Sequence, residues 1–382
     1  MKRRTFFTLA ALTTFASIWQ ARAQNLSSKQ RTLLVVQLVG GNDGLNTCIP
    51  YRDPNYIRLR PSLAIKDGIP ITSQIALHPS LEKLKPLFDA QKLTIVQNVS
   101  YPNPSLSHFR SQDIWQSGQL TEGSISGWLA RYLSTIKADT ADAVFIGDEY
   151  PLALLGAKDE RYLQLSPNLR LATGDKVGRA VQVAYNVTQS HPLAEVVRQA
   201  VLAGQAAVDQ FQSKVNQKTN SGDYPQDNIG NQFAFASVVL EALPPIVYLT
   251  VGGWDTHVNQ LPQHQRLLKS VGDSLAALMN DLKTRGSDGN VLIMVQTEFG
   301  RRVAQNGSGG TDHGTATPVF FLGNNLKGGI LGGQPNLDSL VNGNLPWQID
   351  FRSLYAETID RWLHGNSVDI LGGSFPYVEF LA

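Results

Sequence analysis

The sequence has little cysteine and no excess of either charge. Its single cysteine among 382 residues rules out an internal disulfide and the class of small disulfide-stabilised proteins. The 33 basic and 31 acidic residues nearly balance at a net charge of +2, so the chain lacks the basic footprint of a nucleic-acid binder. Hydrophobic residues make up 42%, too many for a disordered chain. The composition therefore indicates a globular protein with ample core.

The first 23 residues have the pattern of an export signal. A basic start precedes an apolar stretch from Phe6 to Trp19, and Ala21-Arg22-Ala23 forms a small-x-small cleavage site. Arg3-Arg4 before Thr5-Phe6-Phe7 resembles the twin-arginine signal; an ordinary secretory peptide that holds two arginines is the alternative. The apolar stretch is too short and too rich in threonine for a membrane span. We predict a twin-arginine-type signal over 1–23, the twin-arginine translocation machinery as a partner, and a mature chain in the periplasm or outside the cell.

The signal also accounts for the positive net charge. It holds Lys2, Arg3, Arg4 and Arg22 and no acid, so the mature chain keeps 29 basic against 31 acidic residues. Twin-arginine substrates are exported folded, and the lone Cys48 agrees with folding in a reducing compartment. We therefore expect the mature chain to be slightly acidic, with no stable membrane span.

Apolar runs alternate with helical patterns along the mature chain. Buried strands are predicted at 32–39, 93–97, 143–147, 246–251, 291–297 and 318–322. Helical spacing is found at 81–91, 107–117, 125–136, 194–215, 233–243, 263–285 and 351–364, and 216–231 is predicted to be a loop. This order predicts an α/β fold with a doubly wound, mostly parallel sheet and helices on both faces. No linker divides 24–382, so we predict a single domain, with 150–240 as the candidate insertion or cap.

Acidic and imidazole side chains follow the predicted strands. The candidate metal ligands are Asp43, Asp255, His257, Glu298, Asp312 and His313. Ligands of open α/β sheets bind outside the carboxyl ends of the strands, so these groups are expected to share a site. We predict one or two divalent cations, with zinc, manganese, iron, magnesium and calcium left open. Taken singly, Asp43 is also a turn former, Asp255 a helix cap and Glu298 half of a surface ion pair.

A second polar group lies in the segment 101–113, after the strand at 93–97. Asn103-Pro104 is typical of a helix start, because proline is tolerated at the first helical position. Ser105 or Ser107 then lies in the first turn, where free backbone N–H groups attract anions.

Three side chains of this segment fit an ester-transfer reaction. Ser107, with Ser105 as the alternative, is the candidate nucleophile beside a metal. Arg110 is placed to grip a phosphate or sulfate, and His108 to protonate the leaving group. The structural alternative is a pair of capping serines and a histidine without a catalytic role.

Six motifs together resemble the bacterial domain-of-unknown-function family numbered 1501. They are GGNDGLN (40–46), SHFRSQDIW (107–115), GGWDTH (252–257), TEFGRR (297–302), GTDHG (310–314) and DFRSLYAETIDRWL (350–363). They span essentially the whole mature chain in the expected order. The resemblance implies the fold of the alkaline phosphatase–sulfatase superfamily, with two metal positions and a Ser, Thr or modified Cys nucleophile.

Residue by residue, the resemblance implies a first metal at Asp255, His257 and His313, and a second at Asp43. Glu298 and Phe299 stand where Asp and His are usual, and Phe299 cannot ligate. The second site is therefore expected to lack its histidine, unless Asp312 or His108 replaces it, and a single metal is an open alternative. Cys48 lies outside the nucleophile segment and is expected to pack in the core.

These patterns predict a metal-dependent hydrolase of phosphate or sulfate esters, acting on a small-molecule or saccharide ester through Ser107. Two alternatives remain open: a non-catalytic envelope or secretion factor that retains the fold, and a metal-dependent phosphotransferase or mutase. The fold alone does not decide among them.

Overall fold

A mixed β-sheet forms the centre of the protein. The computed structural model describes residues 17–23, 30–121, 123–136, 142–156, 162–165 and 192–382. Its main strands are β1 (Thr32–Leu38), β5 (Leu93–Ser100), β6 (Ala143–Ile146), β7 (Tyr162–Leu165), β8 (Ile246–Val251), β9 (Val291–Thr297), β10 (Thr317–Leu322), β11 (Gly329–Leu331) and β12 (Ile349–Asp350). Within the described residues they make a nine-stranded sheet of order β11-β5-β10-β9-β1-β8-β6-β7, with β12 also paired to β5.

Most neighbouring strands run parallel. β1 pairs in parallel with β8 and β9, and β6 with β7 and β8. The exception is β10, which runs antiparallel to both β5 and β9. The predicted α/β class and mostly parallel sheet are confirmed, and the carboxyl ends of β1, β8 and β9 lie at one edge.

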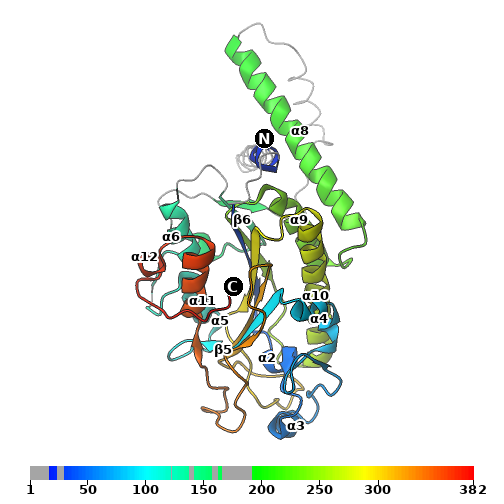
Figure 1. The fold of residues 1–382 in the computed structure, drawn as a ribbon, viewed down its shortest axis with the longest axis vertical. Coiled ribbons are helices and arrows are strands. Elements are labelled where there is room, and N and C mark those ends of the chain that lie inside the picture. The colour runs from blue at the N-terminus through cyan, green and yellow to red at the C-terminus, as the bar shows by residue number, and fades with distance from the viewer. Residues whose placement is uncertain (1–16, 24–29, 122, 137–141, 157–161, 166–191) are drawn as a thin grey trace.

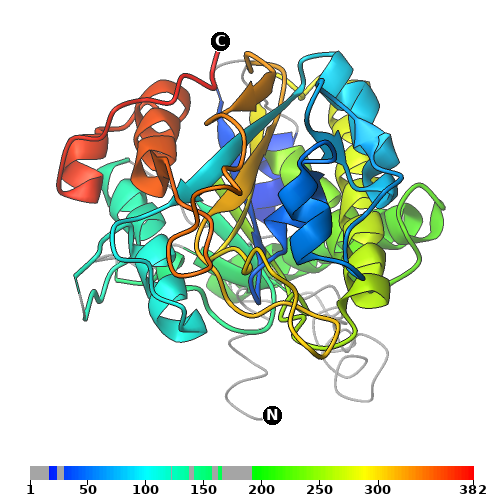
Figure 2. The ribbon, with the colours of Figure 1, turned by 90° about the horizontal axis from the view of Figure 1, so that it is seen from below.

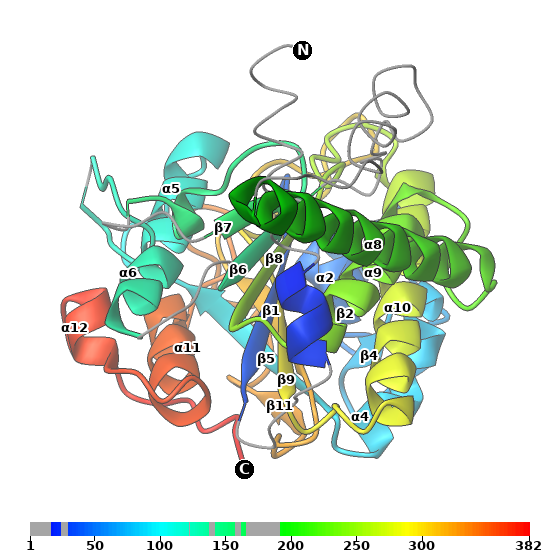
Figure 3. The ribbon, with the colours of Figure 1, turned by 90° about the horizontal axis from the view of Figure 1, so that it is seen from above.

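Helices cover both faces of the sheet. α8 (Pro192–Asn220), α9 (Asn228–Val239) and α10 (Gln260–Thr284) lie on one side, and α5 (His108–Ser117), α6 (Trp128–Thr135), α11 (Phe351–Glu357) and α12 (Ser367–Leu371) on the other (Figures 1 and 3). The view from below also shows strands between two helical layers (Figure 2). Alternate residues of β1 serve the two cores: Leu34 and Val36 in one, Leu33 and Val35 in the other.

Short elements follow β1. They are α2 (Gly44–Thr47), β2 (Cys48–Ile49), α3 (Pro54–Leu59), β3 (Ile69–Pro70), β4 (Ala76–Leu77), the 3₁₀ helix η1 (Pro79–Leu84) and α4 (Lys85–Asp89). The three short strands form a separate antiparallel sheet of order β2-β4-β3. Cys48 is a buried free thiol, and burial raises its pKa above the usual range.

The predicted loop over 216–231 is too long. α8 continues to Asn220, and α9 begins at Asn228, where the Asp227 carboxylate accepts a hydrogen bond from the Gly230 N–H at 2.8 Å. Phe211 of α8 packs edge-on against Phe235 of α9, with ring centroids 5.4 Å apart. The polar composition of this segment reflects a capped helix start as well as a turn.

The end of the predicted export signal packs on the fold. Residues 17–23 are helical, and the buried Trp19 indole donates to the Val238 carbonyl at 2.8 Å. Arg22 forms an ion pair with Asp142 at 3.1 Å. Residues 1–16 lie outside the described residues, so the signal stays a prediction. So does the cap, of which 157–161 and 166–191 are outside them. Within the described part of the chain, no helix has the length and hydropathy needed to cross a membrane.

Candidate metal centre

Three imidazoles meet around one carboxylate at the carboxyl edge of the sheet. The Nε2 atoms of His257 and His313 lie 3.0 and 3.1 Å from Asp255 Oδ1, and His108 Nε2 lies 3.5 Å from it. The two ring nitrogens of His257 and His313 are 2.9 Å apart. Three imidazole nitrogens from three segments of the chain therefore surround one carboxylate oxygen.

Different loops bring these residues together. Asp255 and His257 follow β8, His108 is the first residue of α5, and His313 lies between β9 and β10, bridged to Arg301. The loop after β8 lies close to the loop after β1, since a Cβ on Gly40 would be 2.4 Å from the Asp255 nitrogen. Gly40 has φ +122°, which also favours glycine. The close approach of these two loops explains why the GGNDGLN motif begins with glycine.

The opposite ring nitrogen of each histidine faces an oxygen acceptor. His108 Nδ1 lies 2.7 Å from Glu298 Oε1, and His257 Nδ1 lies 3.2 Å from Asp312 Oδ1. His313 Nδ1 lies 2.8 Å from the Leu106 carbonyl oxygen. A proton on each Nδ1 satisfies these contacts and leaves the lone pairs on Nε2, the arrangement usual for metal-ligating histidines.

Glu298 and Phe299 support the histidines from behind. The Glu298 side chain is fully buried and also accepts from the Gly40 N–H at 2.9 Å. Its hydrogen bond raises the pKa of His108 against the effect of burial. The buried Phe299 ring lies 4.8 Å from the His108 ring and 4.7 Å from the His313 ring. Glu298 thus orients a ligand, and Phe299 supplies an apolar wall.

Arg301 is an important residue of the site that the sequence analysis missed. Its fully buried guanidinium donates to the Gly41, Thr311 and Trp254 carbonyl oxygens and to Asp255 Oδ1 at 2.7 Å. Burial raises the pKa of Asp255, but the hydrogen bond and the charge of Arg301 outweigh it and lower that pKa to about 2. Asp255 is therefore ionised at neutral pH. The only sequence signal for Arg301 was its place in the TEFGRR motif.

Asp43 faces away from this cluster in its contacts. Its buried carboxylate pairs with Arg60 at 2.6 Å, accepts from Gln260, and caps α2 at the Asn46 N–H. Burial raises the Asp43 pKa, yet the Arg60 charge and hydrogen bond leave it below its ordinary value. The structure thus gives Asp43 a buried cation as its partner where the sequence suggested a second metal.

The three predicted catalytic residues lie in the first turn of α5 with different surroundings. Ser107 is the exposed N-cap, and its side chain makes no capping bond. Ser105 Oγ accepts from the Ser107 N–H at 3.2 Å. The Arg110 guanidinium donates to the Leu120 and Thr121 carbonyl oxygens instead of facing the cluster. His108 belongs to the cluster itself.

The donor set fits one divalent cation. His108, Asp255 and His313 each offer a ligand atom within 4.8 Å of the others, the single such group among the described residues. His108 Nε2 is buried and has no hydrogen-bond partner. Three imidazoles with one carboxylate suit zinc, manganese or iron better than the all-oxygen sites of magnesium and calcium.

The fold and the cluster define an α/β protein with a histidine–aspartate centre at the carboxyl edge of its sheet. The chain belongs to the family described as "Protein of unknown function (DUF1501)", whose model matches residues 90–344. That range contains all four cluster residues, while Asp43 lies before it. No curated protein matches the chain.

Solved structures with a similar fold include three bacterial proteins. The alkaline phosphatase from the Antarctic bacterium TAB5 is 12% identical, with 76% of this chain and 91% of that chain covered and a TM-score of 0.33. The PsFucS1 sulfatase from Pseudoalteromonas sp. is 12% identical, with 94% of this chain and 72% of that chain covered and a TM-score of 0.37. The C-terminal periplasmic domain of EcEptC from Escherichia coli, in complex with Zn, is 11% identical, with 77% of this chain and 73% of that chain covered and a TM-score of 0.35. Likeness at this level assigns no activity to this chain.

Proposed function

We propose that this protein is a metal-dependent hydrolase of phosphate or sulfate esters, exported in folded form to the periplasm by the twin-arginine machinery. The observation that carries the proposal is the convergence of three imidazole Nε2 atoms on Asp255 Oδ1, with each Nδ1 held by an oxygen acceptor.

His108, Asp255, His257 and His313 would hold the cation. A bound metal would supply Lewis-acid stabilisation of the ester oxygens and lower the pKa of a neighbouring hydroxyl. His108, assigned by the sequence to proton transfer, is thereby given to the metal. Glu298, Asp312 and the Leu106 carbonyl orient the imidazoles, and Arg301 keeps Asp255 ionised.

Ser107 is the nucleophile of this proposal. It precedes His108 directly and follows Leu106, whose carbonyl oxygen orients His313. The Ser107 hydroxyl is exposed and free of a capping bond, so it is available to attack phosphorus or sulfur. Ser107 Oγ forms a bond to phosphorus or sulfur as the bond to the alcohol oxygen breaks, and the proton lost by the Ser107 hydroxyl ends on the leaving alcohol. Water then hydrolyses the serine ester, which restores Ser107 and releases phosphate or sulfate. The free N–H groups of the first turn of α5 favour the anionic group.

A matched pair of serine variants tests the proposal. We expect the wild-type protein to hydrolyse a chromogenic phosphate or sulfate ester, and Ser107→Ala to lower kcat by about a thousand-fold or more. Ser105→Ala, two residues away in the same segment, should stay within a few-fold of wild type. Equal loss in both variants, or hydrolysis insensitive to Ser107, contradicts the proposal. Release of free phosphate or sulfate separates hydrolysis from group transfer.

One observation favours a second function, that of a non-catalytic envelope factor. The Arg301 guanidinium already places a positive charge 2.7 Å from Asp255 Oδ1 and offsets part of the cluster's negative charge. If this function holds, Asp255→Ala abolishes a cellular phenotype of the wild-type protein while Ser107→Ala retains it.

A further inference from the structure

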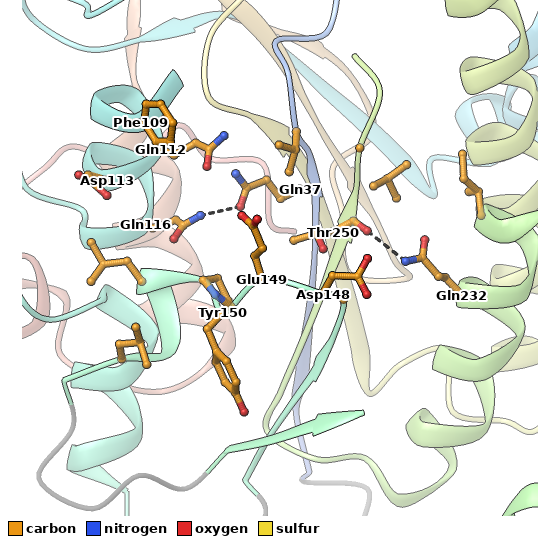
Figure 4. A pocket seen from close by; sticks show the side chains of 18 of the residues that line it. Gln37, Phe109, Gln112, Asp113, Gln116, Asp148, Glu149, Tyr150, Gln232 and Thr250 are labelled. Atoms are coloured by element: carbon orange, nitrogen blue, oxygen red, sulfur yellow. Dashed lines mark hydrogen bonds between the residues drawn. The ribbon is translucent and has the colours of Figure 1, made fainter. Parts of the chain in front are cut away.

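A cavity of about 700 Å³ lies along α5, the helix whose first residue, His108, belongs to the metal centre (Figure 4). Its walls are α5, the ends of β1 and β8, the loop after β6 and the start of α9. Gln112 of α5 lines the cavity and also donates to Glu298 Oε1 at 3.3 Å. Phe109, another lining residue, follows His108 directly. The cavity and the centre therefore share one helix turn, as expected for two parts of one substrate site.

The charge of the cavity excludes anions. Its described lining includes Asp113, Asp148 and Glu149, and none of its described lining residues is Lys, Arg or His. A second phosphate, sulfate or carboxylate in this space would meet like charge without a cation to offset it. The part of the substrate that enters the cavity must be neutral or positively charged.

Two buried glutamine amides restrict which chemical groups the cavity can bind. Gln37, 2% exposed, accepts at Oε1 from Gln116 Nε2 at 2.9 Å and from the Tyr248 hydroxyl. These contacts fix both amides, so Gln37 offers its Nε2 as a donor and Gln116 its Oε1 as an acceptor. Neither atom has a hydrogen-bond partner among the described residues, and Figure 4 shows both side chains in the cavity wall. A hydroxyl satisfies a donor and an acceptor together, whereas an ammonium group only donates.

Aromatic side chains complete the cavity. Phe109 is 85% exposed on α5, and Tyr150 is 41% exposed on the loop after β6. The ring of Phe109 is exposed enough to offer a face to the apolar C–H side of a ring-shaped ligand. We propose that the cavity binds a neutral sugar, whose hydroxyls meet the amides and carboxylates and whose ester group reaches the metal centre. This inference rests on the proposed function for the ester but not for sugar binding itself.

Equilibrium binding tests the inference without turnover. Calorimetric titration of the full mature protein with neutral methyl hexosides is expected to show saturable binding, and the matching amino sugars and uronic acids are expected to bind more weakly. Phe109→Ala, at an exposed position, and Gln116→Leu should each weaken binding about tenfold, the loss of one good contact. Gln74→Leu, an exposed glutamine outside the cavity lining, is the matched control and should change it less than twofold.

The outcomes separate the two proposals. Sugar binding that Phe109→Ala and Gln116→Leu weaken supports the inference, even if no ester is hydrolysed and the proposed function fails. Absence of binding by any neutral methyl hexoside, preference for the charged sugars, or binding that neither variant changes would overturn the inference. The last result stands against it even if Gln116→Leu folds poorly, because Phe109→Ala perturbs only an exposed side chain.

Discussion

The buried pair Asp43–Arg60 separates a structural role of Asp43 from a metal-binding one. Both side chains are at most 1% exposed, and the guanidinium also donates to Asn46 Oδ1 and to the Val303 and Arg302 carbonyl oxygens. Asp43→Asn removes the negative charge and leaves this guanidinium uncompensated in the core. Breaking one side of such a pair costs about 3–5 kcal/mol. At an m-value of about 3 kcal/mol/M, the urea midpoint falls by roughly 1–2 M.

The stabilising contribution of Asp43 decreases as the pH falls. Because the folded pKa of Asp43 is below its ordinary value, its contribution is present above the unfolded pKa of about 4 and is lost as pH falls through the folded value. Urea unfolding at neutral and acidic pH, with metal content measured alongside, checks both claims. An Asp43→Asn protein that unfolds like wild type, or one that remains stable but loses a bound metal, would contradict a structural role of Asp43.

Two further predictions concern other parts of the fold. Gly310→Ala puts a Cβ 2.3 Å from the His257 backbone and should lower the amount of metal that the protein retains, although no ligand is removed. Gly289→Ala is the control, because a Cβ there has nothing within 4 Å. Equal metal retention in the two variants would contradict the geometry of the site. Asp281→Asn removes the negative charge that accepts from Lys218, Tyr224 and Ser237, leaves a single acceptor oxygen, and should destabilise the protein by about 1–3 kcal/mol. Since these contacts lower the Asp281 pKa despite burial, the difference in stability from wild type should shrink below pH 4, and a difference that stays constant with pH argues against this role.

The central strands could be predicted because their burial on both faces is written as continuous apolar runs. β8 and β9 begin and end where those runs do. The antiparallel direction of β10 has no such signature, since a buried strand has the same composition in either direction. The two-residue strands β2, β3 and β4 are too short to carry any periodicity.

The sequence indicates that some of the side chains of the site lie close together, but not which partners each of them has. Asp255, His257 and His313 follow from their places near strand ends, which a sheet brings to one edge. That His108 joins them depends on the packing of α5 against the segment after β9, through Glu298. The partner of Asp43 is Arg60, 17 positions further along the chain, and no local sequence pattern predicts this pairing. Pairings of this kind arise only in the folded chain.

The most direct test of the metal centre is the metal content of the natively exported protein, measured by elemental analysis. The proposed centre predicts one divalent ion per chain, lost in His257→Ala and His313→Ala and retained in Asp43→Asn. A metal-free wild-type protein, or a second ion that disappears with Asp43→Asn, would contradict it.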